Sequence, residues 1–538
     1  MSVQSKMDPE TLSMILDTLT KLEKEKLTVT TKLELDQKGE FPMELARFML
    51  GPEVALHLIF IPAEYGGLGA GAREIAVVSE KMAKIDLGIA TSFLASCLGM
   101  DPIRVGSTPA QKEKYITMVA EKGFILAYGV TEPEAGSNVQ SLKTKAERVL
   151  DESGKVKGYR LNGQKQFITN GGLADLYTIL ANTPEGPSFF IVEAGAPGLI
   201  PGKHEDKHGI RASNTCPLTL EDLYVPVENL VSGVEGQGLK QANEVFGYTR
   251  LMVATFGLGA GMAALEKTIA YAKQRVQFGT PLTEKQGYTH KLLVPNAVRL
   301  EAARAYVEHV GDRIDSGEAG LEVEGSIAKY FATEAGDVMA NDAIQGLGGY
   351  GYIREYEVEK IKRDVKITTI FEGTSEIQQS IISTFRLRDT VRSKGGYYTD
   401  MAGALEALAE ETGGPWLATG IRALNDLILD VRKVKLTKAQ YVMFLLAELM
   451  TWCEVADTLC RKAALKPAGE RSPEFLSAAA RLFANEAMGK IYLHGLKILQ
   501  NHAGDMAASS AKIRGLKMEV GVGEPIKDMD LIAAELVR

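Results

Sequence analysis

The residue with the clearest chemical potential in this sequence is Glu372, which lies in the run IFEGTSEIQ at residues 370–378. A carboxylate in a loop can accept a proton as a general base. Gly373 follows it directly and lets backbone and ligand approach closely, while Thr374 and Glu376 add polar groups beside it. Taken alone, a Glu-Gly pair is usually a solvated turn. The run therefore predicts a base only if distant segments of the chain indicate the same chemistry.

The composition is that of a globular protein and excludes several classes of function. The chain has 538 residues, 45% of them hydrophobic and 24% charged, which is ordinary for a chain of roughly two to four domains. Its 61 basic and 69 acidic residues give a net charge of −8, which argues against a nucleic-acid partner. No run of about 18 apolar residues occurs, so no transmembrane segment is expected.

The cysteines and the N-terminus indicate a reducing compartment. The four cysteines, Cys97, Cys216, Cys453 and Cys460, lack the C-x2-C spacing of a zinc site, and we expect no metal. On one helix Cys453 and Cys460 would lie about 10 Å apart, too far for a disulfide. Acidic residues occur early in the N-terminal segment and disfavour an export signal or a mitochondrial presequence. We therefore expect reduced thiols and a cytoplasmic location.

The spacing of apolar and turn residues divides the chain into four segments. These segments must hold the candidate site residues in place. Residues 1–125 have apolar positions at helical spacing and predict an N-terminal helical domain. Residues 126–236 contain short β-rich runs between Gly, Pro and Asn turns, which predict a middle β-domain. Residues 237–392 predict a helical bundle that carries Glu372, and residues 393–538 predict an additional helical domain. The expected fold is mainly α with a β-domain in the middle.

Three local patterns make sharper predictions. Ser472-Pro473-Glu474 combines a cap, a proline and an acid in the order that starts a helix, and Thr437 is predicted to cap the helix before it. The run GLGGYG at residues 346–351 fits the dinucleotide-binding pattern G-x-G-x-x-G. That fold needs a strand before the glycines, whereas residues 332–344 have a helical pattern. A Rossmann site is therefore not expected there.

Five runs together resemble the acyl-CoA dehydrogenase family, over about residues 40–388. The runs are IPAEYGGLG at 61–69, YGVTEPEAGSN at 128–138, NGQKQFITNG at 162–171, RVQFG at 275–279, and the segment from residue 345 to the Glu372 run. The resemblance implies an N-terminal helical domain, a middle β-domain and a C-terminal four-helix bundle. Residues 393–538 resemble the extra helical domain of very-long-chain relatives, although without a specific motif.

The resemblance implies FAD as the cofactor. The loop that begins at Thr131 would present backbone donors to one edge of the flavin ring, and Phe167 would cover the ring face opposite the substrate. Many relatives carry Trp where Phe167 stands; Phe still stacks but lacks the indole donor. The positions that match flavin contacts in these runs are Tyr128, Val130, Thr131, Ser137, Phe167, Thr169, Thr374 and Glu376.

Four further positions resemble contacts that cross between subunits. Arg275 and Phe278 match residues that hold the FAD of a neighbouring subunit, and an Arg fork suits a diphosphate because it donates in pairs. Gln345 and Gly349 match a second contact of this kind. The resemblance therefore implies a homo-oligomer, either a dimer or a tetramer.

The implied reaction is the removal of two hydrogens from an acyl-CoA. Glu372 would accept the α-proton, and its own backbone N–H would bind the thioester carbonyl with a ribityl hydroxyl of FAD, so that enolate charge is stabilised. Some relatives place their base at the position of Thr249, which cannot serve, so Glu372 must. Ser137, Thr249, Arg250 and Gly373 are the expected substrate contacts.

The sequence determines the acyl group and the electron acceptor less closely than it determines the reaction. Residues 87–91, LGIAT, lack the arginine of glutaryl-CoA relatives, so we expect a long or bulky acyl group, with aryl-substituted or dicarboxylic groups left open. Electron-transfer flavoprotein is the acceptor that the resemblance implies. An acyl-CoA oxidase that uses O2 is one alternative. A non-enzymatic assembly protein is another, although the intact Glu372 and flavin loop argue against it.

Overall fold

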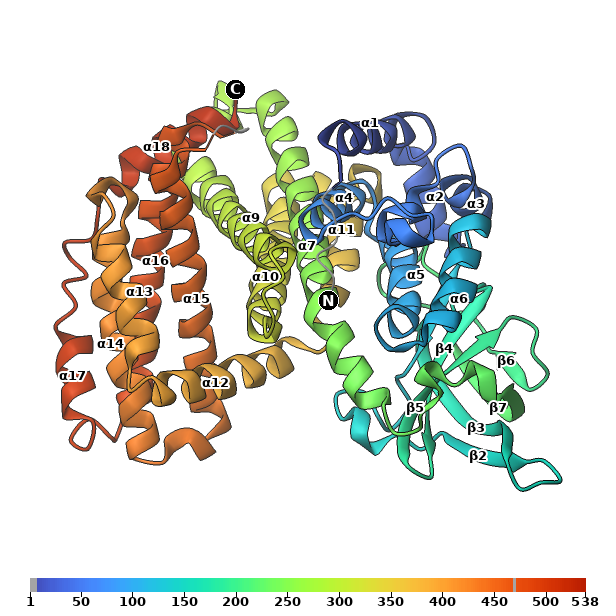
Figure 1. Cartoon of the computed structure of the whole chain (residues 1–538). Helices are drawn as coiled ribbons and strands as arrows, with labels where there is room; N and C mark the ends of the chain where they lie inside the picture. The colour runs from blue at the N-terminus through green and yellow to red at the C-terminus, as the bar shows by residue number, and fades with distance from the viewer. Residues whose placement is uncertain (1–6, 468–470) are drawn as a thin grey trace. The chain divides into compact units, whose positions relative to one another are not determined.

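The computed structural model describes residues 7–467 and 471–538, and the fold is mainly helical with a β-domain in the middle of the sequence, as predicted (Figure 1). The chain separates into two compact units. Unit 1 comprises Met1–Met252, Gly311–Ala319 and Lys360–Ile367, and unit 2 comprises Val253–Val310, Gly320–Glu359 and Thr368–Arg538. The boundaries near residues 125, 236 and 392 stay predictions.

Local signals set the ends of the helices with which unit 1 begins. α1 starts after Asp8, whose carboxylate accepts a hydrogen bond from the Thr11 amide. α6 ends at Gly123, whose φ of 59° is left-handed; a Cβ there would lie 2.4 Å from the Leu50 carbonyl oxygen. The helices are α1 Pro9–Glu25, α2 Val29–Lys38, α3 Met43–Leu50, α4 Ala72–Ile85, α5 Leu87–Gly106 and α6 Pro109–Lys122.

A seven-stranded sheet forms the β-domain of unit 1. Its strand order is β1-β4-β2-β3-β7-β6, with β5 paired to β4. Buried side chains such as Tyr159, Leu161 and Phe190 form its core, and α5 packs against β1. The strands are β1 Leu126–Gly129, β2 Lys145–Leu150, β3 Val156–Thr169, β4 Leu176–Thr183, β5 Gly186–Glu193, β6 Leu199–Pro201 and β7 Thr215–Pro226.

Long helices and one short hairpin follow the β-domain. In unit 2, α7 and α10 approach closely at Gly257 and Gly336, because a Cβ on Gly336 would lie 2.1 Å from the Gly257 carbonyl oxygen. The helices are α7 Gly238–Gln274, α8 Gln286–Tyr288, α9 Val294–Asp315, α10 Glu322–Leu347, α11 Val358–Val365 and α12 Ser375–Arg392. The hairpin strands are β8 Val276–Gln277 and β9 Thr280–Pro281.

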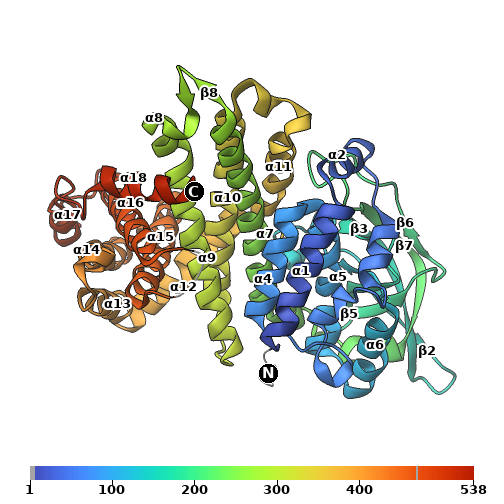
Figure 2. The same ribbon diagram turned by 90° about the horizontal axis from the view of Figure 1, so that it is seen from above.

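The last part of the chain is a helical block within unit 2, as predicted. Its helices α13, α14, α15 and α16 lie side by side (Figure 1, Figure 2). Trp452 stacks on Phe483 at a ring distance of 4.8 Å, and Phe331 of α10 meets both rings edge-on. The helices are α13 Gly396–Glu406, α14 Gly414–Lys433, α15 Gln440–Leu465, α16 Pro473–Leu499, α17 Ala507–Arg514 and α18 Pro525–Leu536.

The structure tests the three local predictions. Ser472 does cap α16, since its hydroxyl accepts a hydrogen bond from the Phe475 amide at 3.0 Å. The prediction for Thr437 is wrong: Lys435 turns the chain with a φ of 62°, residues 436–438 form a short 3-10 helix, and α15 begins only at Gln440. The glycine run at 346–351 follows α10, a helix, so the strand that a dinucleotide fold requires is replaced by a helix there.

A buried charge cluster joins the block to the helix that follows the Glu372 run. Arg386 of α12 donates to both carboxylate oxygens of Glu454 on α15, at 2.8 and 2.9 Å, and to Glu324 on α10 at 3.0 Å. The Tyr398 hydroxyl donates to Glu454 at 3.1 Å. All four side chains are buried. Because these charges are withdrawn from water, removing one of them would leave the others as unpaired buried charges, which is strongly destabilising.

Across residues 7–467 and 471–538, no helix is both long enough and apolar enough to cross a membrane. All four cysteines are buried free thiols.

Candidate functional site

The backbone of unit 2 is strained at the predicted base. Glu372 has a φ of 55° and Gly373 a φ of 89°, so two successive residues lie in the left-handed region, where a glutamate is disfavoured. α12 begins immediately afterwards, and the Thr374 side chain caps it by accepting from the Ile377 amide at 3.4 Å. The positive end of the helix dipole favours a carboxylate at this place.

Two buried side chains hold the carbonyls of this turn, which we call the base loop (residues 370–374). The Gln378 amide donates to the carbonyls of Glu372 and Gly373, both at 3.0 Å. The Lys329 ammonium of α10 donates to the Gly373 carbonyl at 2.7 Å. A Cβ on Gly373 would lie 2.6 Å from the Gln378 nitrogen. Only glycine fits this position without displacing the amide that holds the loop.

Side chains on either side of the base loop are also packed or paired. Phe371 packs on Phe256 of α7 at a ring distance of 6.3 Å. The Ser375 hydroxyl donates to Glu334 of α10 at 2.6 Å. Glu376, a predicted flavin contact, is exposed in the first turn of α12. α10 therefore fixes the start of α12 on both sides of Thr374.

In unit 1 the structure brings the two predicted flavin segments together. Thr131 follows β1, and its carbonyl accepts from the Gln166 amide at 2.8 Å. The Val130 carbonyl accepts from the Lys165 ammonium at 3.3 Å. Tyr128, in β1, lies just before these contacts. The stretch from 128 to 131 therefore runs beside the end of β3.

Phe167 is presented outward by an irregularity in the sheet. The β3–β7 pairing shifts register between Lys165 and Ile168, and Phe167 takes a φ of 58° with 65% of its surface exposed. A large apolar ring held outward on a strained backbone suits the flat, partly apolar face of a flavin. Thr169 pairs with Thr215 at the end of the strand, and Ser137 is exposed in the loop after β1.

A buried ion pair anchors the loop that begins at Thr131, which we call the flavin loop (residues 131–137). No role was assigned to this pair from the sequence. Lys165 donates to Glu132 at 2.7 Å, and both side chains are almost fully buried. Glu132 also accepts from the amides of Lys143 and Thr144. Burial lowers the pKa of Lys165 to about 8, against the pull of Glu132. Burial alone would raise the pKa of Glu132, but the Lys165 charge and the hydrogen bonds outweigh it and lower that pKa.

We expect Glu132→Gln to destabilise the protein by about 3 kcal/mol. Breaking a buried pair typically costs about 3–5 kcal/mol, and the value should be at the lower end because Lys165 can give up its proton. The double variant with Lys165→Met should recover much of the loss, since no unpaired charge remains. Thermal and denaturant unfolding, with flavin retention, measure this. The control is Glu185→Gln, at an exposed contact with Arg148. Equal effects of the two single substitutions would contradict the prediction.

The two predicted substrate contacts on α7 lie within its unit 1 portion. Thr249 is buried and Arg250 is half-buried. Thr249 has no carboxylate, so it offers no alternative base at that position.

The predicted subunit contacts gather at one end of unit 2. Phe278, at the tip of the β8–β9 hairpin, has a φ of 51° and is 97% exposed. Arg275 lies over the Tyr350 ring at 5.7 Å, and Gly349 directly precedes that tyrosine. Gln345 is exposed near the end of α10. The structure thus brings the hairpin and the 345–350 turn together.

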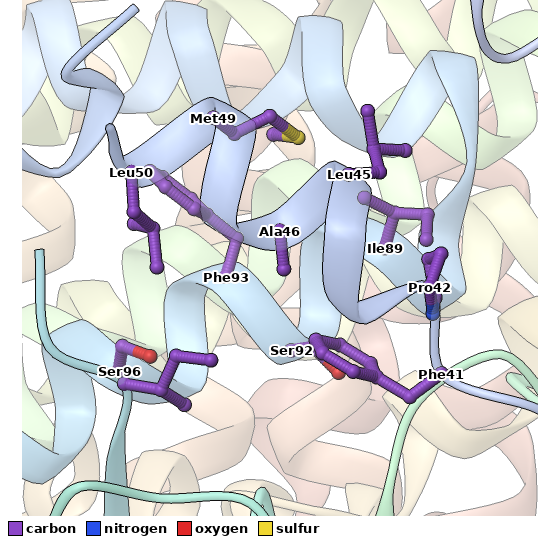
Figure 3. Close-up of a pocket in the computed structure, with 11 residues that line it drawn as sticks. Phe41, Pro42, Leu45, Ala46, Met49, Leu50, Ile89, Ser92, Phe93 and Ser96 are labelled. Atoms are coloured by element: carbon purple, nitrogen blue, oxygen red, sulfur yellow. The ribbon is translucent and has the colours of Figure 1, made fainter. Parts of the chain in front are cut away.

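A small, mainly apolar pocket lies in unit 1 between α3 and α5 (Figure 3). Its polar atoms include the hydroxyls of Ser92 and Ser96. The residues that line this pocket are different from the predicted site residues. Within the described ranges, no group of three or more His, Cys, Asp or Glu side chains could hold a metal ion.

Family models of known proteins match three successive parts of the chain. The model of the acyl-CoA dehydrogenase N-terminal domain matches residues 9–122, that of the middle domain matches 127–223, and that of the C-terminal domain matches 236–386. An acyl-CoA dehydrogenase from Bacillus subtilis is 40% identical over 363 residues, which are 66% of this chain and 93% of the relative.

Two further relatives are informative, one for the acyl group in its name and one for its length. A cyclohex-1-ene-1-carbonyl-CoA dehydrogenase from Syntrophus aciditrophicus is 36% identical over 355 residues, 65% of this chain and 83% of the relative. The crystal structure of an acyl-CoA dehydrogenase complexed with FAD from Bacillus anthracis superposes with a TM-score of 0.87 at 26% identity. That match covers 100% of this chain and 97% of the other, so it includes the C-terminal helical block.

Proposed function

Because the chain belongs to the acyl-CoA dehydrogenase family of FAD-dependent oxidoreductases, we propose that it converts a long or bulky acyl-CoA to the 2-enoyl-CoA with Glu372 as the base. The reaction removes a proton from the α-carbon and a hydride from the β-carbon. FAD, when bound, supplies the acceptor for the hydride. The protein must supply a base, a donor for the thioester carbonyl, and the alignment of both.

The base loop is the observation that carries this proposal. Glu372 lies at the positive end of α12 on a strained backbone whose carbonyls are held by Gln378 and Lys329. A carboxylate held in this way is poised to accept the α-proton. We assign the backbone N–H of Glu372 as a donor to the thioester carbonyl, where enolate charge develops. Gly373 leaves room for the ligand beside both groups.

The residues of the two predicted flavin segments in unit 1 fit an FAD ring. Phe167 offers an outward aromatic face, and the loop from Tyr128 to Thr131 is anchored beside it by backbone contacts. We assign the remaining flavin contacts from the resemblance, and Ser137, Thr249, Arg250 and Gly373 as contacts of the substrate. The proposed flavin contacts are Tyr128, Val130, Thr131, Ser137, Phe167, Thr169, Thr374 and Glu376.

The acyl group and the acceptor belong to the same proposal. One relative is named for a ring-bearing acyl group, cyclohex-1-ene-1-carbonyl-CoA, which supports a bulky substrate. We propose electron-transfer flavoprotein as the acceptor and the cytoplasm as the location. An oxidase would differ only in reacting rapidly with O2 after reduction.

Anaerobic mixing with a series of acyl-CoAs tests the proposed function. The flavin absorbance should bleach fastest with long-chain or ring-bearing acyl-CoAs, and 2-enoyl-CoA should form in equal amount. Reoxidation should then be fast with electron-transfer flavoprotein and slow with O2. Fast reoxidation by O2 would instead favour the oxidase. A flavin that no acyl-CoA bleaches would contradict dehydrogenation altogether.

The exposed hairpin supports a homo-oligomer, a dimer or tetramer, in which Arg275, Phe278, Gln345 and Gly349 contact a neighbour. We expect Phe278→Ser to shift the protein to smaller species and to weaken FAD retention. A side chain that is 97% exposed within one chain contributes little to folding, so any effect must come from a partner. Light scattering with flavin absorbance measures both quantities. The control is Leu465→Ser, at a residue that is 79% exposed; an active monomer loaded with FAD would contradict the assignment.

A further inference from the structure

A lysine with no solvent exposure reaches the base loop from α10. The Lys329 side chain is fully buried, and its Nζ donates to the Gly373 carbonyl at 2.7 Å. We propose that Lys329 is a positioning residue for the dehydrogenation: its ammonium holds the strained turn that carries Glu372 in the geometry required for proton abstraction. This inference rests on the proposed role of Glu372 as the base.

The Gly373 carbonyl accepts from two side chains, one charged and one neutral. The Gly373 carbonyl already accepts from the neutral amide of Gln378 at 3.0 Å. Withdrawing an ammonium from water is costly, and a buried cation is retained only where its interactions compensate. A hydrogen bond from a charged donor is roughly twice as strong as a neutral one. The ammonium therefore gives this carbonyl a firmer anchor than Gln378 provides.

A firm anchor matters here because the backbone is strained. Glu372 and Gly373 both have left-handed φ values, which persist only where the surroundings over-determine them. The Gly373 carbonyl lies in the peptide plane that follows Gly373, so holding it fixes the turn on the C-terminal side of Glu372, while Gln378 holds the Glu372 carbonyl itself. Misplacing a reacting group by about 1 Å can lower a rate roughly 100-fold.

The charges around the loop give Lys329 a second consequence. Glu334, which accepts from Ser375, and Glu376, in the first turn of α12, are both acidic. Negative neighbours favour the protonated form of a carboxyl group, and a positive neighbour favours the ionised form. Glu448 of α15 is a third acid near Tyr330, but it is paired with Lys490 of α16. Lys329 opposes Glu334 and Glu376 and favours the carboxylate that the base must have.

Three variants separate positioning from general packing. Lys329→Met keeps the aliphatic stem and removes the donor and the charge. Lys329→Gln restores a neutral donor on a shorter stem. Thr333→Val is the control on the same helix, one turn further, because its hydroxyl donates to carbonyls of α10 itself, those of Lys329 at 2.7 Å and Tyr330 at 3.4 Å.

We expect Lys329→Met to slow anaerobic flavin bleaching about 10- to 100-fold with little change in acyl-CoA affinity, and to move the limiting acidic pKa of the rate upward. Lys329→Gln should recover part of the rate without restoring the pH profile, and it serves as the test if the Met variant does not fold. Amide hydrogen exchange of residues 368–378 should be faster in Lys329→Met than in the wild type, in the flavin-free protein as well, and unchanged in Thr333→Val.

A wild-type bleaching rate in Lys329→Met, unchanged exchange of residues 368–378, or an equal loss in Thr333→Val would each overturn the inference. Glu372→Gln, measured in parallel, separates this failure from failure of the proposed function. If Glu372→Gln abolishes bleaching while Lys329→Met behaves as the wild type, only the role of Lys329 falls. If Glu372→Gln still bleaches, the base is misassigned and both proposals fall.

Discussion

Glu372→Gln is expected to abolish flavin reduction while leaving FAD and acyl-CoA binding largely intact. Glutamine keeps the size of the side chain and its hydrogen-bonding capacity, so Gln378 and Lys329 can still hold the loop. It cannot accept the α-proton at neutral pH. General-base catalysis contributes up to about 10⁴-fold, and the loss should reach at least that value because Thr249 offers no substitute carboxylate.

The measurement is anaerobic mixing of the variant with a substrate that bleaches the wild type. We expect a ligand-induced spectral shift, which reports binding, without bleaching. Glu355→Gln, at an exposed glutamate of the same unit, is the matched control and should bleach at the wild-type rate. Rapid bleaching in Glu372→Gln would show that another group takes the proton.

Arg386→Met should cause the largest loss of stability among single substitutions outside the base loop. The methionine fills part of the space, but it leaves the buried carboxylates of Glu454 and Glu324 without the guanidinium that pairs with both. Removing one partner of a buried ion pair typically costs about 3–5 kcal/mol. Two carboxylates share this arginine, so the upper part of that range is expected.

Thermal and denaturant unfolding measure the effect, with Arg422→Met as the control. Arg422 also donates twice to one carboxylate, that of Glu406, but Arg422 is only half-buried and Glu406 is exposed. Solvent screens such pairs strongly, so the control should change the unfolding midpoint little. Similar losses of stability in Arg386→Met and Arg422→Met would contradict the prediction, because they would show that burial does not increase the cost of removing the arginine.

The sequence predicted best where a signal is local. The cap at Ser472 needs only its own hydroxyl, a proline and the next turn, and α16 begins where that pattern predicts. Thr437 is likewise a residue type that commonly caps helices, yet Lys435 turns the chain just before it and the helix begins later. A cap signal cannot report the backbone turn that precedes it. The division into helical and β segments was predictable because it depends on periodicity over many residues.

Buried charges were harder to predict because their partners are distant in sequence. Lys165 pairs with Glu132, 33 residues away, and Lys329 reaches Gly373, 44 residues away. One signal was available for Lys165, since it occupies the inward register of β3 that Tyr159 and Leu161 also occupy. A charged residue at an inward position predicts a buried partner. The roles assigned to the flavin and substrate contacts stay predictions.

The left-handed backbone at Glu372 sets stability and catalysis against each other at one position. Glycine would relieve a strain of about 1–2 kcal/mol there, so selection for stability alone would replace the glutamate. Selection for proton abstraction retains it. Among relatives that share this turn, the residue at this position is therefore an evolutionary indicator: a glutamate kept on an unfavourable backbone marks a lineage under pressure for turnover, and drift to glycine marks one released from it.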